Sequence, residues 1–120
     1  MPRSGRWILA PGARRDLAAI LEESNRRFGP LQQERYALLI GTAIERVADN
    51  PQCVGSKARD DILEGLRSFH IGTAARRQGA ASHVLFYERR TNAEGVALVV
   101  ILRILHDHMD PELHITNDPA

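Results

Sequence analysis

The chain has 120 residues, 43% hydrophobic and 26% charged, and its sixteen basic and fifteen acidic side chains leave a formal net charge of +1. This near-neutrality argues against non-specific nucleic-acid binding, and the single cysteine, Cys53, excludes an internal disulfide or a cysteine-based metal cage. We therefore expect one cytoplasmic domain over residues 1–120, with a core from about 6 to 113 and neither a secretory segment nor a membrane contact.

The first half of the chain predicts a short strand followed by two helices. The strand candidate is Arg6–Ala10, and Pro11 begins a stretch in which apolar residues recur at helical spacing. At Phe28–Pro30, a glycine followed by a proline ends this helix and starts the next, which stops at Asp49–Pro51. Because only a tight turn separates them, the two helices should form an antiparallel hairpin.

The second half predicts strands joined by loops. Residues 51–64 read as a loop with a short helical turn around 58–63, and residues 66–71 then alternate as a strand. In this strand, the side chain of Leu66 should point to the opposite face of the sheet from those of Phe69 and Ile71. A polar hairpin loop over residues 72–82 leads to another strand at 83–87, and a turn at 91–95 precedes the last strand.

That last strand, residues 96–105, is the most apolar stretch of the chain. Its many β-branched residues favour a strand that is buried on both faces and lies inside a sheet. It is about half as long as a membrane span, and Arg103 interrupts it. The element order is β-α-α-β-β-β, so we expect an α+β fold in which the helix hairpin covers one face of a small, mainly antiparallel sheet.

Motifs spread over roughly residues 7–113 resemble the ParE branch of the ParE/RelE toxin family, whose fold has this element order. Each motif is short, and their joint order and spacing carry the resemblance. They are Ala13, Asp16-Leu17 and Ile20; Phe28-Gly29, Tyr36 and Leu39; Pro51, Gly55 and Gly65-Leu66-Arg67; His83-Val84-Leu85-Phe86-Tyr87; and Ile104-Leu105-His106 with Met109-Asp110.

The resemblance implies the toxin of a bacterial type II toxin–antitoxin system, of the kind linked to plasmid stabilisation and neutralised by a ParD-like antitoxin. ParE-type toxins inhibit DNA gyrase, so it implies a binding protein that poisons another enzyme, with no catalytic residue, no cofactor and no sequence-specific binding to nucleic acid by the toxin alone. RelE-type relatives instead cleave mRNA on the ribosome. This alternative stays open because fold alone does not determine function.

Cleavage of RNA needs proton-transfer groups and cations close together, which His83, Tyr87 and His106 with two arginines could supply. Arg67 and Arg103 lie on predicted strands and could project to one face as a phosphate clamp, or each could pair with a nearby carboxylate. The polar end of the last strand is also a natural place for target contact. The candidates for contact with the target are Arg67, Arg103, His106, His108, Met109 and Asp110.

The same polar segment contains potential metal ligands in His106, His108, Asp110 and His114. Since no histidine or carboxylate elsewhere in the sequence is placed to complete a site, and the segment leads from a strand into a terminal tail, we predict no metal site.

A groove beside the helix hairpin should receive an apolar stripe of the antitoxin, which would fold as it binds. Tyr36 should be exposed there because its hydroxyl needs a polar partner, and Trp7 lies on an edge strand that can accept another strand. The candidates for antitoxin binding are Trp7, Leu17, Ile20, Leu21, Tyr36 and Leu39.

Overall fold

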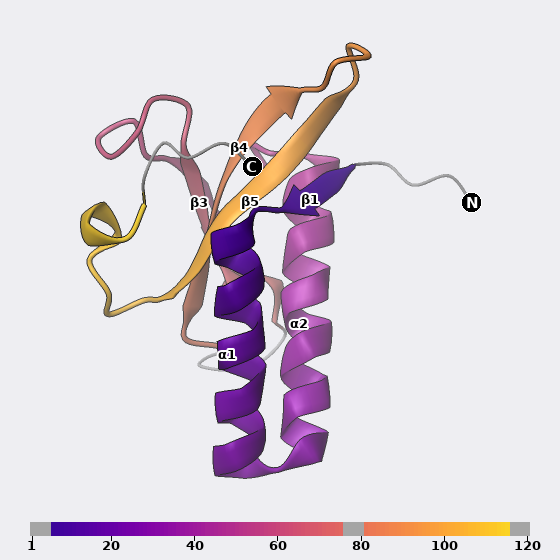
Figure 1. Cartoon of the computed structure of the whole chain (residues 1–120), viewed down its shortest axis with the longest axis vertical. Coiled ribbons are helices and arrows are strands. Elements are labelled where there is room, and N and C mark those ends of the chain that lie inside the picture. The colour runs from indigo at the N-terminus through magenta and orange to yellow at the C-terminus, as the bar shows by residue number, and fades with distance from the viewer. Residues whose placement is uncertain (1–5, 76–80, 116–120) are drawn as a thin grey trace.

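The computed structural model of the chain describes residues 6–75 and 81–115 (Figure 1). Two long helices pack beside a twisted sheet, and two short 3₁₀ helices follow β3 and β5. In chain order, the elements are β1 (Trp7–Leu9), α1 (Pro11–Phe28), α2 (Pro30–Asp49), β2 (Ser56–Ala58), β3 (Arg67–His70), η1 (Ile71–Ala74), β4 (His83–Thr91), β5 (Ala97–His106) and η2 (Pro111–Leu113).

The five strands form one sheet in the order β1-β5-β4-β3-β2. Strand β1 runs parallel to β5, whereas the other neighbours are antiparallel, so the sheet is mixed. The most apolar strand of the sequence, β5, lies inside the sheet between β1 and β4. The predicted α+β fold with a helix hairpin and an antiparallel meander is confirmed.

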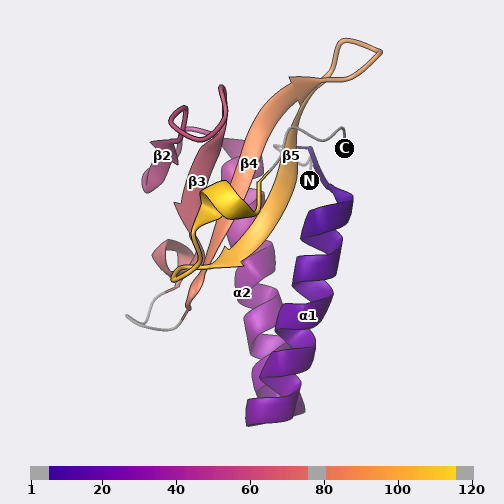
Figure 2. The same ribbon diagram turned by 60° about the vertical axis from the view of Figure 1, so that its left-hand side comes forward.

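Strand β5 is buried on both faces, as its apolar sequence predicts. Val99 and Ile101 join the core under the helices, whereas Val100 and Leu105 join a smaller core on the opposite face. Figure 2 shows η2 and the helices on opposite sides of the sheet. The second face is therefore partly covered by the segment before β3 and by the C-terminal segment, which contributes the buried Ile115.

Strand β3 has the phase that the sequence predicts, because Leu66 and Phe69 lie in the cores on opposite faces of the sheet. Strand β2 is not predicted, because its sequence, Ser-Lys-Ala, has no apolar alternation and its pairing with β3 alone defines it. The helical turn expected around 58–63 is present as a single hydrogen-bonded turn, without a regular helix. In this turn, the carbonyl of Arg59 accepts from the backbone N–H groups of Ile62 and Leu63.

The loop expected over residues 72–82 begins inside η1, and its residues 76–80 lie outside the described part of the chain. In the helix hairpin, Gly29 joins the two helices with a φ of 91°, a left-handed backbone conformation that residues other than glycine rarely adopt. The tip of the hairpin extends past the end of the sheet (Figure 1). Among the described residues, no helix is both long and apolar enough to cross a bilayer.

Candidate functional site

Arg103 of β5 forms a bidentate ion pair with Asp16 of α1. Its Nε donates to Asp16 Oδ2 at 2.7 Å and its Nη2 donates to Oδ1 at 2.9 Å, while Nη1 donates to the carbonyl of His114 at 2.7 Å. Both side chains are largely buried, with 26% and 14% of their surfaces exposed. The pair joins the first helix, the central strand and the C-terminal segment.

The same carboxylate completes the hydrogen bonding of β5. Strand β1 ends at Leu9, so within the described part of the chain β5 has no strand neighbour on that side beyond this point. Asp16 Oδ2 accepts the backbone N–H of Ile104 at 2.9 Å. A buried backbone N–H without a partner is costly, so Asp16 satisfies a group that the short edge strand leaves open.

Of the two arrangements that the sequence leaves open for Arg67 and Arg103, the structure shows pairing within the fold and no shared phosphate clamp. Arg67 pairs across the sheet with Tyr87, which lies in the core under the helices, whereas Arg103 pairs with Phe86 on the other face. A β-bulge between Phe86 and Tyr87 shifts the register at this point. Arg67 Nε donates to Ser56 Oγ at 2.7 Å, so both guanidinium groups have structural partners.

Tyr36 is buried, with 8% of its surface exposed, and the prediction that it is exposed is wrong. Its hydroxyl finds polar partners inside the protein: it accepts the N–H of Ser82 at 3.2 Å and shares a hydrogen bond of 2.7 Å with Nδ1 of His83. Tyr87 is also buried, and its hydroxyl donates to the carbonyl of Pro51 at 2.6 Å. Tyr87 therefore supports the core and does not reach a catalytic face.

Burial raises the pKa of both tyrosines above the ordinary value. Tyr36 and Tyr87 are the two tyrosines of the chain. We expect spectrophotometric titration of the folded protein to give both tyrosines midpoints above pH 10, the usual tyrosine pKa. Because each tyrosine has a higher pKa in the folded than in the unfolded protein, its contribution to the free energy of unfolding is fully present below the unfolded-state pKa. This contribution is lost as the pH rises through the folded-state pKa. Midpoints at the usual value in the folded protein would contradict this expectation, and Tyr87→Phe isolates the titration of Tyr36.

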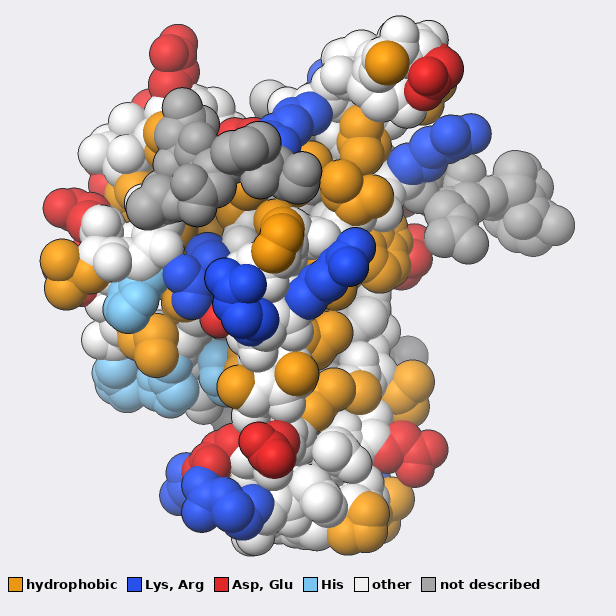
Figure 3. All heavy atoms as spheres, viewed as in Figure 1, with side chains coloured by type: hydrophobic (Ala, Val, Ile, Leu, Met, Phe, Trp, Pro, Cys, Tyr) orange, Lys and Arg blue, Asp and Glu red, His pale blue; other side chains and the backbone are white. Residues whose placement is uncertain are grey.

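Four histidines from three strands and the following turn gather around Asp107, and we call this group, with Asp107, the histidine cluster. Figure 3 shows histidine side chains together on one side of the molecule, above the tip of the hairpin. The cluster forms because β4 pairs with β5 in a register that sets His83 opposite His106, while β3 carries His70 to the same end of the sheet. Its members are His70, His83, His106, Asp107 and His108.

Inside the cluster, His106 lies between the imidazole rings of His83 and His108 and contacts both. His83 meets His106 edge-on with ring centres 5.3 Å apart, and His106 stacks on His108 at 4.9 Å. Burial lowers the pKa of His83, which favours its neutral form, and its Nδ1 forms the hydrogen bond with the Tyr36 hydroxyl. The hydrogen bond from His70 lowers the pKa of Asp107, which keeps this carboxylate ionised.

Two hollows lie on either side of this cluster. A groove of about 700 Å³ runs between the hairpin and the end of the sheet, and a smaller cavity of about 380 Å³ lies on the opposite face. His106 and Met109 line both of them. The groove has apolar walls from Ile20 and Phe28, whereas Lys57 contributes a cation to the smaller cavity.

Comparison with known proteins agrees with this architecture. The sequence profile of the family described as ParE toxin of type II toxin–antitoxin system, parDE, matches residues 7–111. The chain belongs to the ParE toxin family. Toxin ParE1 from two strains of Mycobacterium tuberculosis is 33% identical over 112 residues, which cover 93% of this chain and 99% of that toxin.

A solved structure is also similar to this ParE-family chain. It is a chain in the crystal structure of the toxin–antitoxin complex RelBE2 from Mycobacterium tuberculosis, with a TM-score of 0.51 and 25% sequence identity. The match covers 86% of this chain and 98% of that chain. The resemblance to the ParE branch that the sequence motifs indicate is confirmed, and the fold is shared with a RelBE complex.

In this ParE-family chain, the candidates for antitoxin binding lie in two settings. Ile20 and Tyr36 line the groove. Leu17, Leu21 and Leu39 are half-buried against the core, as is Trp7, whose indole Nε1 donates to Glu45 Oε2 at 2.9 Å. Sequence reasoning missed Phe28, which is 67% exposed and lines the groove.

The candidates for target contact divide in the same way. Arg67 and Arg103 are held by structural partners, whereas His108, Met109 and Asp110 are exposed in the turn after β5. Asp110 accepts the N–H of Glu112 at 3.1 Å and so begins η2. His70 and Asp107 were missed because their contact joins positions 37 residues apart, which the local sequence does not relate.

Proposed function

We propose that this ParE-family toxin acts in the cytoplasm as a binding protein that inhibits DNA gyrase. Family membership supports this, together with one observation in the site: Arg67 and Arg103 point to opposite faces and are already bound within the fold. A ribonuclease would need such cations near its proton-transfer groups. The exposed turn after β5, with His108 and Met109, is the surface proposed to contact gyrase.

A ParD-like antitoxin is proposed to fill the groove beside the hairpin. The groove has the features of a helix-binding surface, with apolar side chains of α1 along one wall and the histidines of β4 and β5 along the other. Phe28 and Ile20 supply apolar contact, and Glu23 and Arg27 provide charged groups at its rim. The similar RelBE2 structure is itself a toxin–antitoxin complex, which supports an antitoxin as partner.

A RelE-like, ribosome-dependent endoribonuclease is the second candidate, and the smaller cavity favours it. Lys57, Arg59, His70 and His106 all line that cavity on the face away from the helices. Cations beside imidazoles are what cleavage by the 2′-hydroxyl requires. Arg59 is already paired with Asp61, with Nε at 3.2 Å from Oδ1, which reduces the charge available to a phosphate.

The deciding experiment incubates the toxin, freed of antitoxin, with purified DNA gyrase and supercoiled plasmid. We expect cleaved DNA to accumulate and the antitoxin to suppress this cleavage. The same protein is added to a translating extract. If mRNA is cut there while gyrase is unaffected, the function is ribonucleolytic, and Lys57 and His106 become the first residues to substitute.

Met109→Ala tests the proposed target surface. Met109 is 47% exposed in the turn after β5, and we expect its truncation to reduce gyrase poisoning at least about tenfold, as for a residue central to an interface. Leu113→Ala is the control, because Leu113 is 78% exposed in the same C-terminal segment but lines neither hollow. Point substitutions are preferable to truncation after Leu105, which would remove Ile115 from the core. Equal potency of the two variants would exclude this surface.

A further inference from the structure

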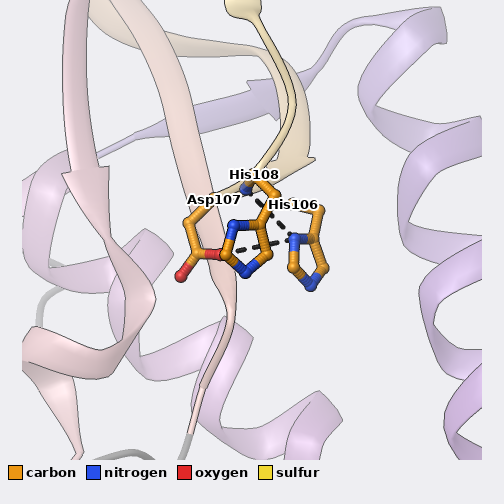
Figure 4. A group of neighbouring side chains, drawn as sticks. All are labelled: His106, Asp107 and His108. Atoms are coloured by element: carbon orange, nitrogen blue, oxygen red, sulfur yellow. Dashed lines mark hydrogen bonds and ion pairs between the residues drawn. The ribbon is translucent and has the colours of Figure 1, made fainter.

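The histidine cluster contains a group of side chains arranged as metal ligands. His106, Asp107 and His108 each offer one ligand atom, and these three atoms lie within 4.8 Å of one another. Figure 4 shows the carboxylate of Asp107 beside both imidazole rings at the end of β5. Neither the proposed contact with gyrase nor antitoxin binding requires this convergence.

The two separations from the Asp107 carboxylate approach those around a tetrahedral ion. With metal–ligand bonds of about 2.0–2.1 Å, tetrahedral zinc separates its ligands by about 3.3 Å. Asp107 Oδ1 lies 3.3 Å from His106 Nδ1 and 3.8 Å from His108 Nε2. The ligand atoms of the group all lie within 4.8 Å of one another, so binding requires the exposed His108 side chain to move by up to about 1.5 Å toward the other two, which its exposure permits.

His70 prepares the carboxylate for this role. The N–H of Gly72 donates to His70 Nδ1 at 3.0 Å, so the proton of the neutral ring is on Nε2. That nitrogen donates to Asp107 Oδ2 at 3.0 Å and leaves Oδ1 facing the two other imidazoles. Hydrogen bonds of this kind orient metal-binding carboxylates in zinc proteins.

His106 already presents a lone pair at the centre of the group. Its Nδ1 accepts the backbone N–H of His108 at 3.1 Å, which identifies Nδ1 as the unprotonated nitrogen of the neutral ring. A metal ion bound to this lone pair would displace the backbone N–H of His108, which lies in an exposed turn and can donate to water instead.

We propose that His106, Asp107 and His108 bind a divalent transition-metal ion of the zinc class, with His70 as the residue that positions the carboxylate. Two imidazoles and one carboxylate suit Zn²⁺ better than the hard ions Mg²⁺ and Ca²⁺, which prefer oxygen ligands. Three protein ligands leave the fourth position to water or to a side chain of a partner. The ion would stiffen the turn after β5, where His106 and Met109 border both hollows.

The test measures Zn²⁺ binding to the full chain without a polyhistidine tag, by calorimetry and by thermal unfolding with and without the metal. We expect saturable binding of one Zn²⁺ that raises the unfolding temperature, and visible absorption bands of four-coordinate Co²⁺ when that ion is added instead. His108→Ala and Asp107→Asn should each lower the Zn²⁺ affinity more than about tenfold. The His108 side chain is almost fully exposed, so His108→Ala should not affect stability in the presence of a chelator, whereas Asp107→Asn weakens the contact with His70 and should lower that stability slightly.

His114→Ala is the matched control, since this histidine lies outside the group of ligand atoms, and its Zn²⁺ affinity should equal that of the unsubstituted chain. His70→Asn should lower the affinity about 10–100-fold, while the loss of its hydrogen bond to Asp107 should lower the stability of the metal-free chain only slightly. The proposal is overturned if Zn²⁺ produces no saturable binding, or if the His108 and Asp107 variants bind it as well as the control does.

Discussion

Asp16→Ala should lower the free energy of unfolding by about 3–5 kcal/mol, the usual cost of removing one partner of a buried ion pair. The substitution leaves the guanidinium of Arg103 largely buried without its carboxylate. It also removes the acceptor of the Ile104 N–H, which none of the described strands reaches beyond the end of β1. Urea denaturation followed by circular dichroism measures the effect, with a lowered midpoint expected at an unchanged m-value.

Glu23→Ala is the control for this prediction. Glu23 lies on the same helix and forms ion pairs with Arg26 and Arg27, in which about half or more of each side chain is exposed. Exposed pairs of this kind contribute little, so the loss should be below about 1 kcal/mol. The double variant Asp16→Ala/Arg103→Met should recover part of the loss, because it removes the unpaired charge. Equal losses for Asp16→Ala and Glu23→Ala would show that the pair does not anchor the fold.

The ion pair of Asp16 with Arg103 also illustrates which features the sequence predicts and which it does not. The helices and the central strand follow from local signals, namely the glycine and proline at residues 29 and 30 and the β-branched run in β5. The pair of Asp16 and Arg103 joins positions 87 residues apart. Its partner choice depends on where β1 ends and how α1 packs, which no local pattern contains.

The site shows the same division. The end of β5 was recognised from its sequence as a polar segment after a buried strand, and the structure places it there. The contact of His70 with Asp107 depends on the register of three strands, and the opposite orientations of Arg67 and Arg103 depend on the position of one β-bulge. The prediction that Tyr36 is exposed rests on the need of its hydroxyl for a polar partner, and it fails because His83 and Ser82 supply that partner inside the protein.

Phe28→Ala should weaken binding of the antitoxin about 30-fold or more, if the antitoxin occupies the groove as proposed. Phe28 is the large apolar side chain at the mouth of the groove, near the tip of the hairpin. Aromatic residues that enter an interface often contribute about 2 kcal/mol or more to its affinity. The change should leave stability almost unchanged, since the side chain is 67% exposed in the chain alone. Calorimetric titration of the purified toxin with the antitoxin measures the affinity.

Leu38→Ala makes the comparison specific to the groove. Leu38 is also 67% exposed, but it lies on α2 and does not line the groove. Its truncation should change the affinity by less than about threefold, because residues outside an interface contribute little to binding. Since the two variants remove apolar side chains of equal exposure, a general loss of surface hydrophobicity would affect them alike. If Leu38→Ala weakens binding as much as Phe28→Ala does, the antitoxin covers the outer face of α2 as well, and the groove is not its main site.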